Sequence, residues 1–302
     1  MTEKAQGSIR LFQILGINVF LHWSWFLVAI YQIQSRAGKY SSIIWNVLEY
    51  LALFLIVLLH EFGHALACRQ VGGQANRIVL WPLGGIAFVS PPQRPGATLW
   101  SIAAGPLVNV ALFPVLSLIA LMSRNWAMHD VHAFFVALWW WNLVMLIFNL
   151  LPIYPLDGGQ IARSLLWFMV GRADSLMIAA ILGFVGVAGM LLVAFFAQSV
   201  WIGVLAVFIL VNCWSALTHA RALARVAKAP RHEGFACPSC RIQPPRGTFW
   251  ICSNCRKPFD TFETNASCPH CGMAFSITAC PECSTRSPIA AWSELKPADK
   301  SF

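Results

Sequence analysis

Long apolar segments dominate the first 220 residues, and they constrain the fold of this chain more than any other feature. Of the 302 residues, 58% are hydrophobic and only 11% are charged, whereas an average soluble domain has about 25% charged residues. A helix needs about 20 apolar residues to cross a bilayer. Six segments of this kind lie at roughly 17–34, 43–67, 97–122, 132–151, 174–197 and 199–220. The chain is therefore predicted to be an α-helical polytopic membrane protein with about six transmembrane helices.

The distribution of basic residues predicts how these helices are oriented. One side of the predicted bundle is rich in them: Lys4, Arg10, Arg69, Arg77, Arg94, Arg163, Arg172, Arg221, Arg225, Lys228 and Arg231. The other side carries only Arg36, Lys39 and Arg124. By the positive-inside rule, we expect a multi-pass protein of the cell (inner) membrane with both termini in the cytoplasm. The first apolar segment lacks a small-residue cleavage site and is expected to be retained.

The second apolar segment ends in the pattern His60-Glu61-Phe62-Gly63-His64. On a helix, His60 and His64 lie one turn apart on the same face, where both can bind one Zn²⁺. Glu61 then lies beside the metal. In a soluble protein this pattern often arises by chance, but ionisable groups are costly inside a membrane and usually serve function there. The apolar setting therefore favours metal-dependent hydrolysis.

A catalytic zinc generally has three protein ligands and one open position, so the motif needs a third ligand. The best candidate is Asp157, in the segment NLLPIYPLDGG at 149–159, on the same predicted side of the membrane. Pro152 and Pro155 break helices, and the paired glycines admit unusual backbone angles, so this segment can direct Asp157 toward the histidines. The alternative is that Asp157 caps a following helix at 161–170.

Three elements in this order resemble the site-2 protease family of intramembrane zinc metalloproteases: HExxH, the element Gly105-Pro106-Leu107-Val108-Asn109, and NLLPIYPLDGG. The resemblance implies a catalytic zinc held by His60, His64 and Asp157. It also implies that Asn109 is catalytic and holds the substrate backbone or the developing oxyanion. From the residues alone, Asn109 could equally form a hydrogen bond that holds the helices together.

Residues 76–89 are apolar but too short for a pair of helices. They are predicted to form a short membrane-associated β-hairpin that turns at 82–85. Members of the family have a membrane-inserted sheet here, and its exposed edge would accept an unwound substrate as an added strand. The alternative is a re-entrant loop.

These features together predict an intramembrane zinc metalloendopeptidase. It would hydrolyse peptide bonds within or near the transmembrane segments of membrane protein substrates, as in regulated intramembrane proteolysis, with Glu61 taking a proton from a zinc-polarised water. The expected partners are a transmembrane protein substrate and the lipid bilayer. One alternative is a membrane metal transporter, which gives no reason for Glu61. The other is an inactive scaffold with a partner-binding tail.

Eight of the ten cysteines form four CxxC knuckles near the C-terminus: Cys237 and Cys240, Cys252 and Cys255, Cys268 and Cys271, and Cys280 and Cys283. Each knuckle offers two thiolates, so the four can form two structural Cys₄ zinc sites of the double zinc ribbon type. A cytoplasmic location keeps the thiols reduced. Consecutive knuckles are expected to pair, although the spacing also permits pairing of the first with the third.

The predicted domains are a membrane metalloprotease domain at 1–228, a linker at 229–235, the double zinc ribbon at 236–285 and a flexible tail at 286–302. We expect one catalytic and two structural Zn²⁺ ions. The ribbon is expected to bind a regulatory protein, whereas it lacks the concentrated basic and aromatic patch of a nucleic-acid binder. The net charge of +9 is already explained by membrane topology.

Overall fold

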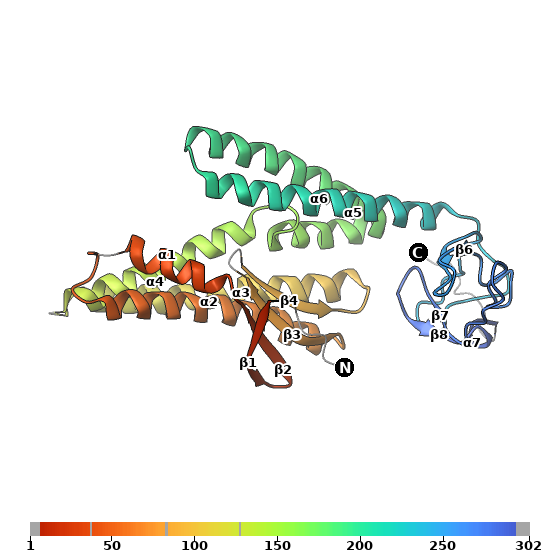
Figure 1. Cartoon of the computed structure of the whole chain (residues 1–302), viewed down its shortest axis with the longest axis horizontal. Coiled ribbons are helices and arrows are strands. Elements are labelled where there is room, and N and C mark those ends of the chain that lie inside the picture. Colours follow the sequence, from red (N-terminus) through yellow and green to blue (C-terminus); the bar gives the residue numbers. More distant parts are fainter. Residues whose placement is uncertain (1–6, 37, 82–83, 127, 294–302) are drawn as a thin grey trace. The chain divides into compact units, whose positions relative to one another are not determined.

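The structure is a computed structural model that describes residues 7–36, 38–81, 84–126 and 128–293 (Figure 1). The chain divides into two compact units. One comprises Met1–Val170 and Ile178–Ser215, and the other comprises Gly171–Met177 and Ala216–Phe302. The HExxH motif belongs to the first unit, and the cysteine knuckles belong to the second.

Among the described residues, five helices are long and apolar enough to cross a membrane: α2 (Ile43–Gln70), α3 (Pro95–Ser123), α4 (His129–Leu150), α5 (Asp157–Phe196) and α6 (Val200–Lys228). The helical polytopic class is confirmed, and the second to sixth predicted segments fall within these helices or end close to them. The helix α5 is interrupted at Gly171, whose φ of 83° and ψ of 176° are not helical. Its second part contains the segment predicted at 174–197.

The prediction of a first transmembrane helix at 17–34 is wrong. This segment forms a strand, β2 (Ile17–His22), followed by the helix α1 (Trp25–Ser35). With 11 residues, α1 is only about 16 Å long. Ile17 and Val19 are fully buried in the core beneath the sheet. Their apolar character therefore reflects packing of a strand rather than contact of a helix with lipid.

A four-stranded sheet covers one end of α2. Its strands are β1 (Ser8–Ile14), β2, β3 (Gln74–Trp81) and β4 (Gly84–Ser90), in the order β1-β2-β3-β4. The pair β2 and β3 is parallel, whereas the other two pairs are antiparallel. The predicted hairpin is thus confirmed, although residues 82–83 of its turn lie outside the described residues.

The sheet is held to α2 by a shared core. Ile78 and Leu80 of β3 are fully buried and pack in one cluster with Ala65 and Cys68 of α2. The last turns of α2, which contain the HExxH motif, therefore lie next to the sheet. As an edge strand, β4 leaves one row of backbone groups unpaired within the sheet.

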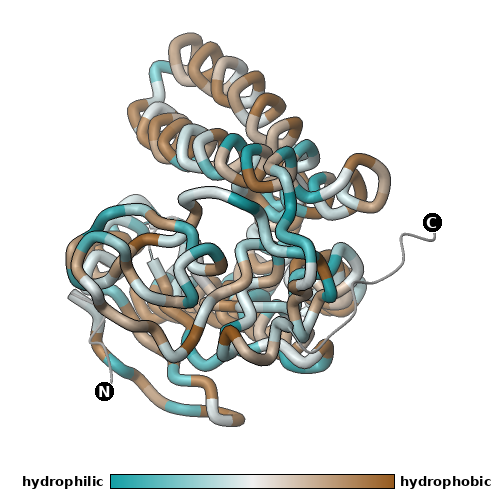
Figure 2. The backbone as a smooth tube through the Cα atoms, turned by 90° about the vertical axis from the view of Figure 1, so that its right-hand side faces the viewer, coloured by the Kyte–Doolittle hydropathy of each residue, from teal (hydrophilic) through white to brown (hydrophobic). Residues whose placement is uncertain are grey.

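The helices α2, α3 and α4 pack on one another, and α5 and α6 form a long hairpin (Figure 1). Many of their large apolar side chains point outward, as expected where lipid rather than water surrounds a helix. Apolar residues predominate along the α5–α6 hairpin (Figure 2). Examples of exposed apolar side chains are Leu51, Val115, Leu118, Ile147, Val185 and Val207.

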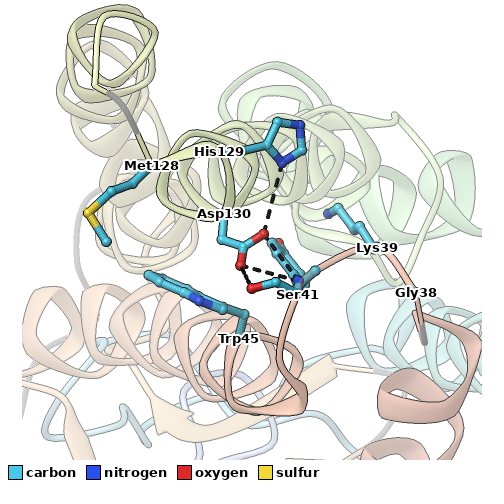
Figure 3. A pocket seen from close by; sticks show the side chains of 8 residues that line it. Gly38, Lys39, Ser41, Trp45, Met128, His129 and Asp130 are labelled. Atoms are coloured by element: carbon cyan, nitrogen blue, oxygen red, sulfur yellow. Dashed lines mark hydrogen bonds and ion pairs between the residues drawn. The ribbon is translucent and has the colours of Figure 1, made fainter.

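The loop between α1 and α2 is fastened at the end of α2 opposite the HExxH motif. Glu49 is 1% exposed, and its carboxylate accepts hydrogen bonds from Tyr40 Oη at 2.5 Å, Lys39 Nζ at 3.1 Å and Trp141 Nε1 at 2.9 Å. Nearby, Asp130 accepts hydrogen bonds from Ser41 beside a cavity of about 590 Å³ (Figure 3). The segment β2–α1 therefore carries the chain from one end of α2 to the other.

The second unit contains two small sheets, β5 (Trp250–Ile251) with β6 (Pro258–Phe259), and β7 (Thr278–Ala279) with β8 (Arg286–Ser287). They are followed by a single turn of helix, α7 (Ala290–Ser293). Trp292 of this turn is fully buried against Phe262. Residues 286–293 are thus folded into the ribbon through β8 and Trp292, in contrast to the predicted flexible tail, while 294–302 lie outside the described residues.

The predicted linker at 229–235 is also packed into this unit. His232 is 6% exposed, and its Nε2 lies 2.9 Å from Asp260 Oδ2. Burial alone would raise the pKa of Asp260, but hydrogen bonds from the Gly247 amide, His232 and the Phe262 amide hold this pKa below its ordinary value. Asp260 therefore joins three segments of the ribbon as a charged acceptor.

Candidate active site

Three side chains predicted as zinc ligands converge in the first unit. His60 and His64 are 2% and 6% exposed, and their Nε2 atoms lie 3.1 Å apart. Asp157, the first residue of α5, places its Oδ2 at 3.0 Å from His60 Nε2 and 3.4 Å from His64 Nε2. One nitrogen of each histidine and one oxygen of Asp157 therefore face a common point.

The other ring nitrogen of each histidine is held by an acceptor. His60 Nδ1 lies 2.6 Å from Asn109 Oδ1, and His64 Nδ1 lies 2.9 Å from the Ser101 carbonyl oxygen. Each Nδ1 must carry a proton to make these bonds, so both Nε2 atoms present lone pairs. Apart from these two histidine nitrogens, no hydrogen-bond donor among the described residues reaches Asp157 Oδ2. Three converging lone pairs of this kind fit a Zn²⁺ ion with one open position.

The facing surface of α3 is shaped to leave room for this site. Ser101, Gly105 and Asn109 are spaced four residues apart and so lie on one face of the helix. A Cβ atom added at Gly105 would collide with His64 Nε2 and would lie 2.9 Å from His60 Nε2. The glycine of the predicted GPxxN element is therefore required because any side chain would enter the ligand cluster.

The segment before α5 folds tightly against the start of that helix. Cβ atoms at Gly158 and Gly159 would collide with the backbone of the preceding loop, and Gln160 Nε2 donates to the Pro155 carbonyl oxygen at 2.9 Å. The Tyr154-Pro155 peptide is cis. The cap position is Leu156, which makes no side-chain cap bond. This geometry supports the ligand interpretation of Asp157 over the capping alternative.

Glu61 follows His60 in α2, beside the three proposed ligands, but its carboxylate is held by a strand of the sheet. It is 5% exposed, and its Oε2 accepts a hydrogen bond of 2.9 Å from the Ala87 amide of β4. The group of residues able to share one metal ion contains His60, His64 and Asp157 but not Glu61. This arrangement agrees with a proton-accepting role for Glu61 and explains why the edge of the sheet lies next to the site.

The Asn109 side chain is not available to contact a substrate. Its side chain is fully buried, with Oδ1 on His60 Nδ1 and Nδ2 donating to Asn142 Oδ1 at 2.8 Å. This geometry favours a role through His60 over the predicted contact with the substrate backbone or oxyanion. Sequence reasoning did not single out Asn142, and its only signal was a carboxamide within the apolar segment at 132–151.

The eight knuckle cysteines form two clusters of four in the second unit. One contains Cys237, Cys240, Cys280 and Cys283, and the other contains Cys252, Cys255, Cys268 and Cys271. The first knuckle thus meets the fourth, and the second meets the third. The prediction that consecutive knuckles pair as first with second and third with fourth is wrong. The sheets β5–β6 and β7–β8 each flank a single knuckle. The first and fourth knuckles meet because the Ala236 amide donates to the Trp292 carbonyl oxygen and because Cys237 and Cys280 share one core with Trp292.

The sulfur geometry of both clusters suits zinc. The Sγ–Sγ distances across the paired knuckles are 3.6 Å and 3.8 Å in the outer cluster and 3.6 Å and 3.6 Å in the inner one. A tetrahedron with Zn–S bonds of about 2.3 Å has edges of about 3.8 Å. Neither cluster contains a disulfide. The donor set of each is therefore complete for one structural metal ion.

The four knuckles share one backbone conformation. In each, the amide of the first cysteine donates to the carbonyl five residues on, and its own carbonyl accepts from the amide four residues on. The residue after the second cysteine has a positive φ in every case: Arg241, Arg256, Gly272 and Ser284. The repeated turn aims both thiols of each knuckle to one side, as a metal site requires.

Comparison with known proteins agrees with the proposed catalytic site in the first unit. The family model described as Peptidase family M50 matches residues 49–125 and 115–193, a region that contains every proposed catalytic-zinc ligand. A zinc metalloprotease of Methanocaldococcus jannaschii is 34% identical over 58% of this chain and 50% of its own length. Stage IV sporulation protein FB of Bacillus subtilis is 37% identical over 37% of this chain and 38% of its own length.

A solved structure, the site-2 protease from Methanocaldococcus jannaschii, is similar with a TM-score of 0.50 and 29% identity. The match covers 70% of this chain and 95% of that one. The chain spans half or less of the length of the two curated relatives named above. The zinc-ribbon cysteines lie outside the ranges of the family match. On the motif, the fold and these matches together, the chain belongs to peptidase family M50, the site-2 protease family.

Proposed function

We propose that this protein is a zinc-dependent intramembrane endopeptidase that cleaves peptide bonds within or near transmembrane segments of membrane protein substrates. The observation that carries this proposal is the convergence of two histidine nitrogens and one carboxylate oxygen, with Glu61 beside them, in a bundle of apolar helices. Ionisable side chains are costly inside a membrane, so those found there usually serve a function.

When bound, Zn²⁺ supplies Lewis-acid chemistry that activates water and the substrate carbonyl. Glu61 then serves as the base that takes the proton of the attacking water and passes it to the leaving amine. The Ala87 amide, at 2.9 Å from Glu61 Oε2, keeps this carboxylate oriented. Because both histidines are fixed through Nδ1 by acceptors of α3, their Nε2 atoms stay aimed at the metal.

The substrate is proposed to bind as an extended strand along β4. A peptide bond within a helix has its carbonyl engaged by an amide four residues on, so a transmembrane substrate must unwind before cleavage. The Ala87 amide points away from β3 and toward Glu61, so groups at this edge of β4 lie beside the base. An added strand there would satisfy the backbone of the unwound segment with the hydrogen bonds of a sheet.

The proposed topology places both termini and the catalytic site on the cytoplasmic side of the cell (inner) membrane. The positive-inside pattern supports this orientation. The proposed topology counts the segment formed by β2 and α1 as one crossing, because β2 begins at the sheet and the α1–α2 loop is fastened at the opposite end of α2. The N-terminal strands and the HExxH motif thus lie at one end of the bundle.

Cleavage of purified single-span substrates by the full chain in proteoliposomes tests the proposed function. We expect cleavage that a zinc chelator abolishes and added zinc restores, and that is lost in His64→Ala. Replacing His129, whose side chain is 88% exposed at the other end of the bundle, by Ala serves as the matched histidine control and should preserve cleavage. Zinc flux across the same membranes without any cleavage would instead favour a transporter.

The two cysteine clusters are proposed to hold two structural zinc ions, because the ribbon is small and structural zinc contributes directly to the folding of such domains. The nested pairing can be tested by counting zinc per chain. Changing Cys237 and Cys240 to Ser should remove one zinc, and changing all four cysteines of the outer cluster, including Cys280 and Cys283, should still remove only one. A loss of two zinc ions from the fourfold variant would contradict the nested pairing.

We further propose that the ribbon binds a regulatory protein. Its apolar core around Phe262 and Trp292 is small, and the two proposed metal sites would fix the remaining backbone, so that the ribbon presents a defined surface to a partner. Co-purification of a partner with the full chain, lost when the outer cluster is removed, is the expected result. Identical partner recovery by the variant and the unmodified chain would count against this role.

A further inference from the structure

A chain of hydrogen bonds connects the metal site to a helix that supplies no ligand. His60 Nδ1 contacts Asn109 Oδ1 at 2.6 Å, and Asn109 Nδ2 donates to Asn142 Oδ1 at 2.8 Å. Asn142 Nδ2 in turn donates to the Asn109 backbone carbonyl at 3.0 Å. The three residues belong to α2, α3 and α4, so this hydrogen-bond relay crosses the bundle.

All members of this chain are shielded from solvent. Asn109 and Asn142 are both 0% exposed, and His60 is 2% exposed. The reciprocal bonds between the two asparagines leave one arrangement of the Asn109 carboxamide, with its nitrogen toward Asn142 and its oxygen toward His60. A rotated carboxamide would place two donors against the His60 Nδ1 proton and would leave Asn142 Oδ1 without its bond.

We infer that Asn142 is a positioning residue of the metal site, acting through Asn109 on His60. Asn142 sets the orientation of the Asn109 carboxamide, and the Asn109 oxygen keeps the proton of His60 on Nδ1. His60 Nε2 is then always available as a metal ligand, and the ring is held at a fixed angle. Outer groups that hold ligating histidines in this way commonly change metal affinity by about 10–100-fold.

This inference rests on the proposed metal site, but its test does not need peptidase activity. The affinity of the full chain for zinc can be measured in detergent by competition with a chelator. We call the zinc that the unmodified chain binds and His64→Ala does not bind the catalytic pool. This difference separates it from the zinc held by the cysteine clusters. If the protein cleaved no substrate, the proposed function would fail, but the zinc affinities would still test the relay.

Two leucine variants break the relay while keeping similar volume. Asn109→Leu should weaken zinc binding at the catalytic pool by about 10–100-fold, and Asn142→Leu by about tenfold, because each releases His60 from its fixed tautomer and angle. Asn46→Leu is the control. Asn46 is 5% exposed in α2 and lies about 21 Å before His60 along the helix, so its loss should leave zinc affinity unchanged.

An aspartate variant separates positioning from simple packing. In Asn109→Asp the carboxylate still accepts from His60 Nδ1, and the Asn142 carboxamide can turn its Nδ2 toward the second carboxylate oxygen. Zinc affinity should therefore recover most of what Asn109→Leu loses. Adding Asn142→Leu to Asn109→Asp should then cost little, since the aspartate has no amide for Asn142 to orient. Unchanged affinity in both leucine variants, an equal loss in Asn46→Leu, or no recovery with aspartate would each overturn the assignment.

Discussion

Replacing Glu61 by Gln is expected to abolish peptide-bond cleavage while leaving zinc bound. The three proposed metal ligands are unchanged, and the carboxamide oxygen of the new side chain can still accept the bond that the Ala87 amide gives to Glu61. The carboxamide cannot, however, accept a proton from water. A positioned general base contributes about 10²–10⁴-fold to rate, so cleavage should fall at least that far, as measured by product formation in proteoliposomes.

Glu49→Gln is the matched control for this prediction. Glu49 is a second buried glutamate of the same helix, but it is engaged by Tyr40, Lys39 and Trp141 at the end opposite the motif. We expect this change to lower stability while folded protein still cleaves substrate and retains zinc. Turnover by Glu61→Gln at the rate of the unmodified chain would remove Glu61 from its proposed role.

Replacing Gly105 by Ala is expected to remove the catalytic zinc altogether. The added Cβ would collide with His64 Nε2 and lie 2.9 Å from His60 Nε2, and contacts this short must displace the rings. The backbone of α3 cannot easily retreat because Ser101 and Asn109, on the same face, hold the two histidines. Zinc per chain should fall by one, and cleavage should be lost with it.

Gly189→Ala provides the control, because a Cβ at Gly189 in α5 would meet nothing within 4 Å. Alanine is a better helix former than glycine by about 0.8–1.0 kcal/mol, so this variant should keep its zinc and unfold no more easily than the unmodified chain. Full zinc content and activity in Gly105→Ala would show that the histidines do not need the space that Gly105 leaves.

The proposed metal ligands could be anticipated from sequence because their spacing reflects local geometry. His60 and His64 share a helix face whatever the rest of the fold does, and the double-proline segment indicates an irregular backbone at Asp157. Asn142 could not be found in this way. Its role depends on the contact between α3 and α4, and nothing within its own helix marks it as different from a packing residue.

The first predicted helix failed for a related reason. Average hydropathy does not distinguish one transmembrane helix from an apolar strand followed by a short apolar helix. Ile17 and Val19 are apolar because β2 is buried next to β3, whose partner residues lie about 60 positions later in the chain. A pairing at that separation leaves no mark within a window of about 20 residues.

The pairing of the cysteine knuckles shows the same limit. Each CxxC turn is locally complete, and the structure gives all four the same conformation. Nothing within a knuckle says which other knuckle completes its site. That choice is made by contacts between distant segments, namely the core around Trp292 and the bond from the Ala236 amide to the Trp292 carbonyl oxygen. Trp292 itself was predicted to lie in a flexible tail.

The nested arrangement of the knuckles also implies an order of assembly for the ribbon. Closing the inner site joins cysteines 13 residues apart, at Cys255 and Cys268, whereas the outer site joins Cys240 and Cys280 across 40 residues. The longer loop costs about 1 kcal/mol more in chain entropy. Closing the inner site first shortens the free chain between the outer knuckles, so a newly made ribbon should capture metal from the centre outward.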